Sequence, residues 1–236
     1  MIVHGSHWCA ALGDFDREKA INTWTACAGG GSVEKLNGNS LFSQKLNDAI
    51  NSIVIIGKTG KTMTMYPQMS LGEPCDVKIS EIKEEQNGEA WVQVKVKDAS
   101  LCLFATDYLK NRSKYKIGAK RRMRISAIAY SVFNKPADKA IEINGKKIAT
   151  KGMCAILPLD LKHKTVYPDD YLYRGQIMDK KNFSSGFAVK VKLIPDVLAV
   201  WLYSTNKSIG KKLRINDFIY GTMWLQGCES SHTHLP

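Results

Sequence analysis

The sequence lacks any long apolar segment. No apolar run among its 236 residues approaches the roughly 20 residues that a helix needs to cross a bilayer. The first nine residues also lack a basic stretch followed by an apolar one, which is the pattern of a secretory signal. We therefore expect no membrane partner, and these two absences favour a cytoplasmic protein.

The cysteines lack the spacing of a metal or redox site. None of the six forms a C-x-x-C pair, which argues against a zinc ribbon or a thioredoxin-like site. An even count permits three disulfides, but a chain of this length can bury a sizeable core without them. We expect reduced thiols, as in a cytoplasmic protein, at Cys9, Cys27, Cys75, Cys102, Cys154 and Cys228.

Catalytic motifs are missing as well. No G-x-S-x-G sequence is present, so there is no nucleophile elbow. His163 is the only histidine away from the two ends of the sequence, and it lies in a basic segment. The pair Asp169 and Asp170 could serve acid–base or metal chemistry, but neighbouring aspartates after a proline are more typical of a turn or the start of a strand. We expect no catalytic residues.

The segment from Gly57 to Thr62 superficially resembles a phosphate-binding loop. Such a loop needs a glycine five positions before Gly60, and that position is Ile55. A helix must also follow, whereas the residues after Lys61 alternate like a strand and reach a proline. The segment therefore predicts a β-hairpin turn and no nucleotide cofactor.

Histidines near both ends have spacings that suit zinc. His4, His7 and Cys9 form one group, and His232 and His234 form another. Nothing in the sequence brings the two groups together, and terminal residues are commonly frayed. We expect surface tails that hold no metal, and no other cofactor.

Basic residues are abundant, and they are unevenly distributed. Lys and Arg number 34 against 22 Asp and Glu, so the formal net charge is +12. The net charge is +1 over residues 1–70, +5 over 71–136 and +6 over 137–236. No acidic residue occurs between Asp107 and Asp138. The densest basic cluster consists of Lys110, Arg112, Lys114, Lys116, Lys120, Arg121, Arg122 and Arg124.

This cluster permits two interpretations. It could be a solvated loop and strand edge that keeps the protein soluble. It could equally be a phosphate-binding surface, because clustered Lys and Arg release counterions when they meet a polyanion.

The first 70 residues differ in pattern from the rest. An acidic N-cap predicts a short helix over residues 14–24, and the glycines at 29–31 end it. Apolar residues near helical spacing predict a second helix over 41–50, and residues 53–56 predict a short buried strand.

Beyond residue 71 the pattern alternates with the period of a β-strand. Residues 91–97 and 187–193 each place apolar side chains on one face and lysines on the other. Residues 123–130 and 197–203 read as further strands, and Asn144-Gly145 predicts a hairpin turn.

Two stretches of this β region share an order of elements. Each has three strands, a polar segment and a last strand, over 75–133 and 171–226. The order is similar to that of the OB-fold, although no family motif supports it, and other small β-barrels or sandwiches would give the same order.

The predicted fold class is mainly β, α+β overall, with two small β-barrel units, OB-like in order, after a helical N-terminal segment. The expected organisation is a mixed helical and hairpin segment over 1–70, β units over 71–136 and 167–236, and a hairpin connection over 137–166.

Aromatic residues lie among the basic ones. By alternation Trp91 shares a strand face with Lys95 and Lys97, and Tyr108 and Tyr115 flank the densest basic cluster. Single-stranded nucleic acid is bound by a positive groove together with aromatic faces on which bases stack. Trp201 and Trp224, which lie inside apolar strands, are expected to be structural.

The leading hypothesis is a non-catalytic protein that binds a polyanion, single-stranded DNA or RNA, on a basic surface with aromatic stacking. Its predicted binding residues are Trp91, Lys95, Lys97, Tyr108, Lys110, Arg112, Lys114, Tyr115, Lys116, Lys120, Arg121, Arg122 and Arg124. Two alternatives stay open. One is an adaptor or subunit whose basic face meets an acidic protein partner, and the other is an enzyme with an unrecognised site.

Overall fold

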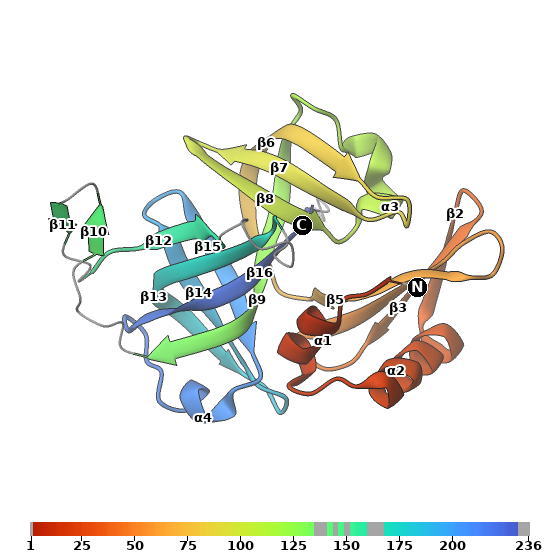
Figure 1. The fold of residues 1–236 in the computed structure, drawn as a ribbon, viewed down its shortest axis with the longest axis horizontal. Coiled ribbons are helices and arrows are strands. Elements are labelled where there is room, and N and C mark those ends of the chain that lie inside the picture. Colours follow the sequence, from red (N-terminus) through yellow and green to blue (C-terminus); the bar gives the residue numbers. More distant parts are fainter. Residues whose placement is uncertain (1, 135–140, 144–145, 149–151, 160–167, 231–236) are drawn as a thin grey trace, which may run out of the picture.

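The structure is a computed structural model that describes residues 2–134, 141–143, 146–148, 152–159 and 168–230. It confirms a mainly β fold (Figure 1). An N-terminal part lies to the right in this view, with one group of strands above and another to the left. The helices among the described residues are all too short or too polar to span a bilayer.

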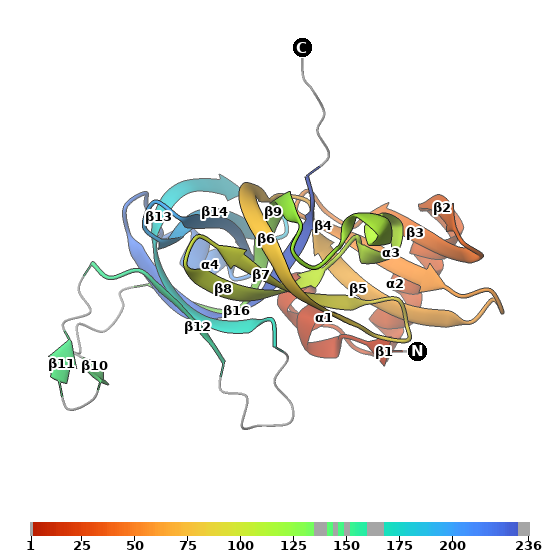
Figure 2. The same cartoon turned by 90° about the horizontal axis from the view of Figure 1, so that it is seen from above.

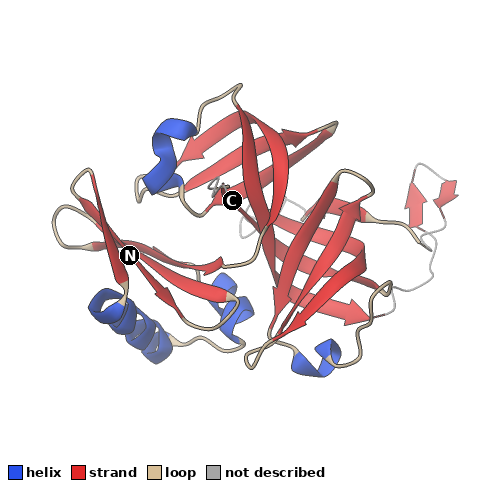
Figure 3. Cartoon of the chain, turned by 180° about the vertical axis from the view of Figure 1, so that it is seen from behind, coloured by secondary structure: helices blue, strands red, loops and turns tan. Residues whose placement is uncertain are grey.

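The N-terminal part consists of two helices and a five-stranded sheet, in which four consecutive strands form an antiparallel meander and the short first strand runs parallel to the last. Helix α2 covers one face of the sheet, as Figure 3 shows. The side chain of Asp16 caps α2 by accepting a hydrogen bond from the backbone N–H of Lys19 at 2.8 Å, so this helix begins beside the acidic cap that the sequence indicates. The elements are β1 (Ile2–Val3), α1 (Gly5–Leu12), α2 (Arg17–Gly30), β2 (Ser32–Leu36), β3 (Asn39–Lys45), β4 (Ile50–Ile56) and β5 (Thr62–Met69).

The helix predicted over residues 41–50 is wrong, because these residues form most of β3 and the start of β4. Asn37 and Gly38 both have positive φ, as a two-residue hairpin turn requires. The turn pairs Leu36 with Asn39 and so commits the following residues to a strand. The hairpin turn predicted at 57–60 is present between β4 and β5, with Gly60 donating to the carbonyl of Gly57.

Nine of the described strands beyond residue 72 form one sheet, in which two circuits of pairing occur. In unit 1, β6 pairs with β7, β7 with β8, β8 with β16, β16 with β9 and β9 with β6. All these pairings are antiparallel except β8 with β16. The strands are β6 (Glu73–Glu84), β7 (Ala90–Val96), β8 (Ala99–Ala105), β9 (Lys120–Asn134) and β16 (Phe218–Glu229), and α3 (Tyr108–Asn111) follows β8.

Unit 2 has the same circuit and uses β9 and β16 again. Here β13 pairs with β14 and β16, β14 pairs with β15, and β15 runs parallel to β9. The further elements are β12 (Ala155–Pro158), β13 (Asp170–Asn182), β14 (Phe187–Ile194), β15 (Leu198–Ser204) and α4 (Lys207–Gly210). Strands β10 (Ile141–Ile143) and β11 (Lys146–Ile148) pair with each other, and residues 144–145, where the sequence predicts a hairpin turn, lie outside the described residues.

The two units agree in detail. The register of β6 on β7 shifts after Ile79, and that of β13 on β14 shifts after Ile177. The carbonyl of Ile79 accepts from the N–H of Gly118, and that of Ile177 accepts from Asn216, each at 2.8 Å. Gly118 and Asn216 both have positive φ. These matches define which positions of the two units are equivalent, and they show that β9 of unit 1 takes the place that β16 takes in unit 2.

One hydrophobic core runs through both units, and a second joins them to the N-terminal part. Residues such as Val92, Met123 and Val191 lie in the first core, fully buried. The second core packs Ile53 and Tyr66 of the N-terminal sheet against residues of the two units that include Trp224. Figure 2 shows the molecule from above, with the N-terminal part to the right, unit 2 to the left and β6, β7 and β8 of unit 1 in front.

The close approach of β9 and β16 gives the first prediction. A Cβ added at Gly221 would lie 2.0 Å from the carbonyl oxygen of Ser131 on the paired strand. We expect Gly221→Ala to lower the free energy of unfolding by about 1–3 kcal/mol, as overpacking does. Gly29→Ala in α2, where the added Cβ meets nothing within 4 Å, is the matched control and should be neutral or stabilising. Denaturant unfolding of both variants checks this, and equal stability would contradict the strand packing.

Candidate nucleic-acid interface

A basic hollow lies on the outer surface of unit 1, where β6, β7 and β9 run side by side. Its volume is about 620 Å³. Six of its eight lining residues are cationic, and one is acidic. The lining consists of Asp76, Val77, Lys78, Lys95, Lys97, Lys120, Arg121 and Arg122.

Strand register places three of these lysines in a row. Lys78 on β6 lies directly opposite Lys95 on β7 and Lys120 on β9. All three side chains are exposed, and among the described residues none of them forms an ion pair. Directly opposed like charges destabilise a sheet, so the row costs stability. We call Lys78, Lys95 and Lys120 the lysine row.

The structure divides the other predicted cations among several places. Lys110 pairs with Glu34 of the N-terminal sheet and Arg112 pairs with Glu84, both at 2.7 Å. Lys114 and Lys116 are exposed on the turn before β9, apart from the hollow's lining. Arg121 donates to the carbonyl of Lys114 at 3.0 Å.

Arg124 lies in a different hollow, between the N-terminal sheet and unit 1, with its Nη2 atom 3.6 Å from the Sγ atom of Cys228. The hollow of unit 1 therefore gathers only Lys95, Lys97, Lys120, Arg121 and Arg122 of the predicted cations. Lys97 also donates to the carbonyl of Asp196 in unit 2 at 3.0 Å.

Lys78 is the cation of the hollow that the sequence reasoning missed. The strand over 75–83 was expected, but the pairing that brings Lys78 between two other lysines depends on register. Alternation could have placed Lys78 on the outer face together with Asp76. It could not have identified its cross-strand neighbours.

Two of the three expected stacking residues lie in the core. Tyr108 is 5% exposed and Tyr115 is 6% exposed, and their ring centroids are 5.3 Å apart. Their hydroxyls donate to the carboxylates of Glu84 and Asp107 respectively. Because no ring face is open, neither tyrosine can stack on a base in this structure. Tyr108 begins α3, and Tyr115 directly follows a single 3-10 turn, so period-two alternation gives no indication of which of these side chains point inward.

Trp91 is partly exposed, and its indole N–H donates to Asp169 at 2.9 Å. The Lys83 ammonium lies 5.3 Å from its ring centroid. Trp201 and Trp224 are buried, as expected for structural residues.

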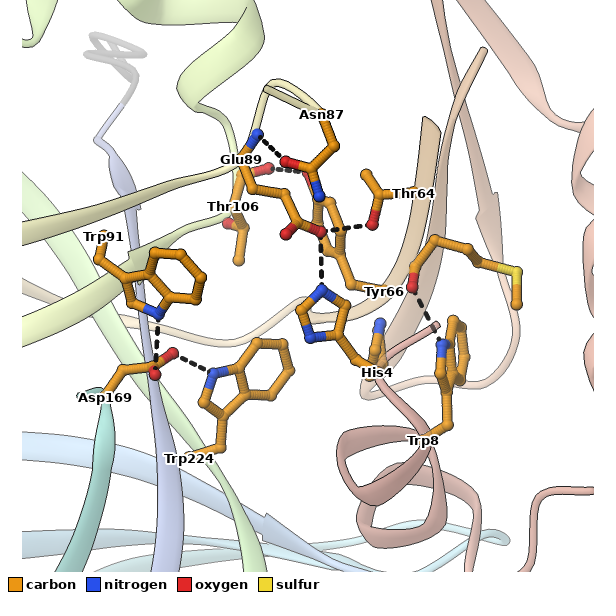
Figure 4. Close-up of polar contacts among 12 residues, drawn as sticks. His4, Trp8, Thr64, Tyr66, Asn87, Glu89, Trp91, Thr106, Asp169 and Trp224 are labelled. Atoms are coloured by element: carbon orange, nitrogen blue, oxygen red, sulfur yellow. Dashed lines mark hydrogen bonds and ion pairs between the residues drawn. The ribbon is translucent and has the colours of Figure 1, made fainter. Parts of the chain in front are cut away.

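A buried polar cluster joins the N-terminal part to both units (Figure 4). The Nε2 atom of His4 lies 2.7 Å from the Glu89 carboxylate, which also accepts from the hydroxyl of Thr64. The ring of His7 stacks on Trp224 with centroids 3.9 Å apart. The expectation that His4 and His7 form a surface tail is wrong, because they are 2% and 1% exposed. Their helix α1 packs against β9, so the residues are interior.

The second half of this cluster is a pair of buried aspartates. Asp169 accepts from the indole N–H groups of Trp91 and Trp224, and Asp170 accepts from the hydroxyl of Tyr130 at 2.6 Å. Burial raises the pKa of Asp169 to about 7, and the neighbouring Asp170 adds to the shift. Burial, together with the His4 ring, lowers the pKa of His7 well below its usual range. Through these buried contacts the cluster joins the N-terminal part to both units.

Within the described part of the chain, no three His, Cys, Asp or Glu side chains group as metal ligands would. His163, His232 and His234 lie outside that part. All six cysteines have free thiols. Comparisons with protein-family models and with curated proteins found no match to this chain.

The raised pKa of Asp169 gives a pH prediction. Its folded-state pKa exceeds that of an unfolded aspartate, about 3.9, so the folded state binds the proton more tightly. This contribution to stability is full below the unfolded pKa and is lost as pH rises towards 7. The stability of the parent relative to Asp169→Asn should therefore fall between about pH 4 and 7 and then level off.

Urea unfolding across this range measures the difference. His7 and the other titrating groups are common to both proteins and largely cancel. The exposed Asp179→Asn serves as the control. A parent-minus-variant difference that does not change with pH would contradict the assignment.

The lysine row gives a stability prediction. Lys78→Gln removes two directly opposed like-charge contacts, so we expect the free energy of unfolding to rise by about half a kcal/mol at low ionic strength. The gain should shrink as added salt screens the charges. Lys45→Gln, which removes a lysine paired with Asp48, is the control and should give no gain. Loss of stability in Lys78→Gln at low salt would show that the row is not repulsive.

Proposed function

We propose that the protein binds a single strand of DNA or RNA without catalysis, with the phosphate backbone in the basic hollow of unit 1. The lysine row is the observation that carries the proposal. Three unpaired ammonium groups on adjacent strands lower stability on their own and gain favourable interactions from a polyanion. Arg121 and Arg122 extend the positive surface along β9.

The connectivity of the units supports the same proposal. In each circuit three consecutive antiparallel strands are followed by a short helix and a fourth strand, which pairs with the first. A fifth strand, contributed by the other unit, runs parallel to the third. We propose that both are OB-like barrels, each of which takes its fifth strand from the other. OB-folds bind single strands on one sheet face, with tolerance of sequence.

Salt dependence tests the proposal. Binding of a mixed-sequence single-stranded oligonucleotide should weaken steeply between about 50 and 200 mM salt. The variant in which Lys78, Lys95 and Lys120 are all changed to Gln should lose about two units of the slope of log affinity against log salt, since each lost contact with a single strand contributes roughly 0.7.

A charge-matched control changes Lys19, Lys45 and Lys61, which lie in the N-terminal part, to Gln and should leave most of the slope intact. Fluorescence anisotropy at several salt concentrations measures both variants. Absence of binding by the parent at about 50 mM salt would overturn the proposal and favour an adaptor for an acidic protein.

A further inference from the structure

The equivalence of the two units identifies a second surface that corresponds to the basic hollow. In unit 1, Lys78 pairs with Lys95 and Lys120. In unit 2, the matching row is Gln176, which pairs with Lys192 and Phe218. The same face of the sheet is therefore cationic in one unit and carries an aromatic ring in the other.

The neighbouring row also carries an aromatic ring in unit 2 where unit 1 has a cation. Asp76 pairs with Arg122 in unit 1, and Arg174 pairs with Tyr220 in unit 2. Tyr220 also lies opposite Phe133 of β9, and their rings stack with centroids 5.1 Å apart and an interplanar angle of 28°. We call this surface the aromatic face; it consists of Phe133, Leu172, Arg174, Gln176, Phe218 and Tyr220.

The aromatic face is open to solvent. Phe133 is 48% exposed and Leu172 is 45% exposed, although both are large apolar residues. They alternate with the buried Val132 and Tyr173, so their outward direction follows from the strand pleat. Exposed apolar groups gathered on one surface indicate a binding site.

The polar groups of this face limit what can bind there. Its cations are Arg174 and, at its border, Lys192, which lies directly opposite Gln176. The guanidinium carbon of Arg174 lies 5.9 Å from the ring of Phe218, and its Nε atom donates to the carbonyl of Met153 at 2.9 Å. No member of the face carries a carboxylate. Rings with a guanidinium and an amide at their edge match a base, which has a π-face and hydrogen-bonding edges. A second copy of the chain would bury Arg174 without an acidic partner on this face, which is costly.

We propose that the aromatic face stacks the bases of the single strand whose phosphates the basic hollow binds. The inference rests on the proposed function. Single-strand binding needs positive charge for the phosphates and ring faces for the bases. The basic hollow of unit 1 supplies the charge, and the equivalent surface of unit 2 supplies the ring faces.

The test compares two probes, an oligothymidylate and an abasic deoxyribose-phosphate strand of the same length. The parent should bind the oligothymidylate at least tenfold more tightly, because base–aromatic stacking is lost on the abasic strand. Phe133→Ala with Tyr220→Ala should remove most of that preference and leave the salt slope unchanged. Ultraviolet cross-linking of the oligothymidylate should map to the strand segments that hold Phe133 and Tyr220.

Two controls separate the outcomes. Ile21→Ala with Val33→Ala removes exposed apolar side chains from the N-terminal part and should keep the preference. Tyr220→Phe keeps the ring and should bind like the parent. Thermal unfolding of each variant checks that the fold is retained.

Failure of this inference differs from failure of the proposed function. If the parent binds neither probe at low salt, the proposed function fails. If it binds both probes equally and the double variant changes nothing, the phosphate surface stands and the stacking site is overturned. A parent dimer that dissociates in Phe133→Ala with Tyr220→Ala would also overturn it, because the face would then bind a second copy.

Discussion

The antiparallel pairing of β9 with β16 is the constraint on which the rest of the structure depends. These strands pair along most of their length, and each one completes both circuits of pairing. Met123, near the start of β9, and Val132, near its end, both lie in the single hydrophobic core that runs through the two units. The small size of Gly221 permits the close approach of the two strands. Because the units share two strands, neither can move as a rigid body without breaking the other.

The N-terminal part is held on this pair by a mixture of apolar packing and buried polar contacts. His7 lies on Trp224, and His4 meets Glu89. These two contacts, together with the packing of α1 against β9, fix the position of α1 on the two units. Ile128 and Trp224, in the middle of the strand pair, pack against the N-terminal part. The basic hollow lies at the Lys120 end of β9, and the aromatic face lies at the Phe133 end.

Sequence patterns predicted most of the β region and little of its assembly. Alternation located strands such as 91–97 and 187–193 because their inward residues are uniformly apolar. The segment 41–50 was misread because the apolar residues there fit a helical spacing, while the decisive signal was the Asn37-Gly38 turn before it. The exchange of β9 and β16 between units could not be predicted, since it depends on pairing between residues about a hundred positions apart.

The candidate site was likewise predictable only in part from the sequence. Alternation placed Lys95 and Lys97 outward, and both line the hollow. It gave no information on Tyr108 and Tyr115, which lie outside the strands and are buried. Lys78 and the aromatic face emerged only from cross-strand register and from the equivalence of the units.

The position of β16 in the sequence has a consequence for synthesis of the chain. Unit 1 begins at β6, yet its circuit of pairings closes only with β16, whose last residue is Glu229. On a ribosome, the strands of both units must therefore wait with open edges until this strand has emerged. The long exposed edges of β8 and β9 would be accessible to other nascent chains during that interval. Charged side chains near the start of β9 oppose such contacts, so the basic residues would also protect the chain before it has folded.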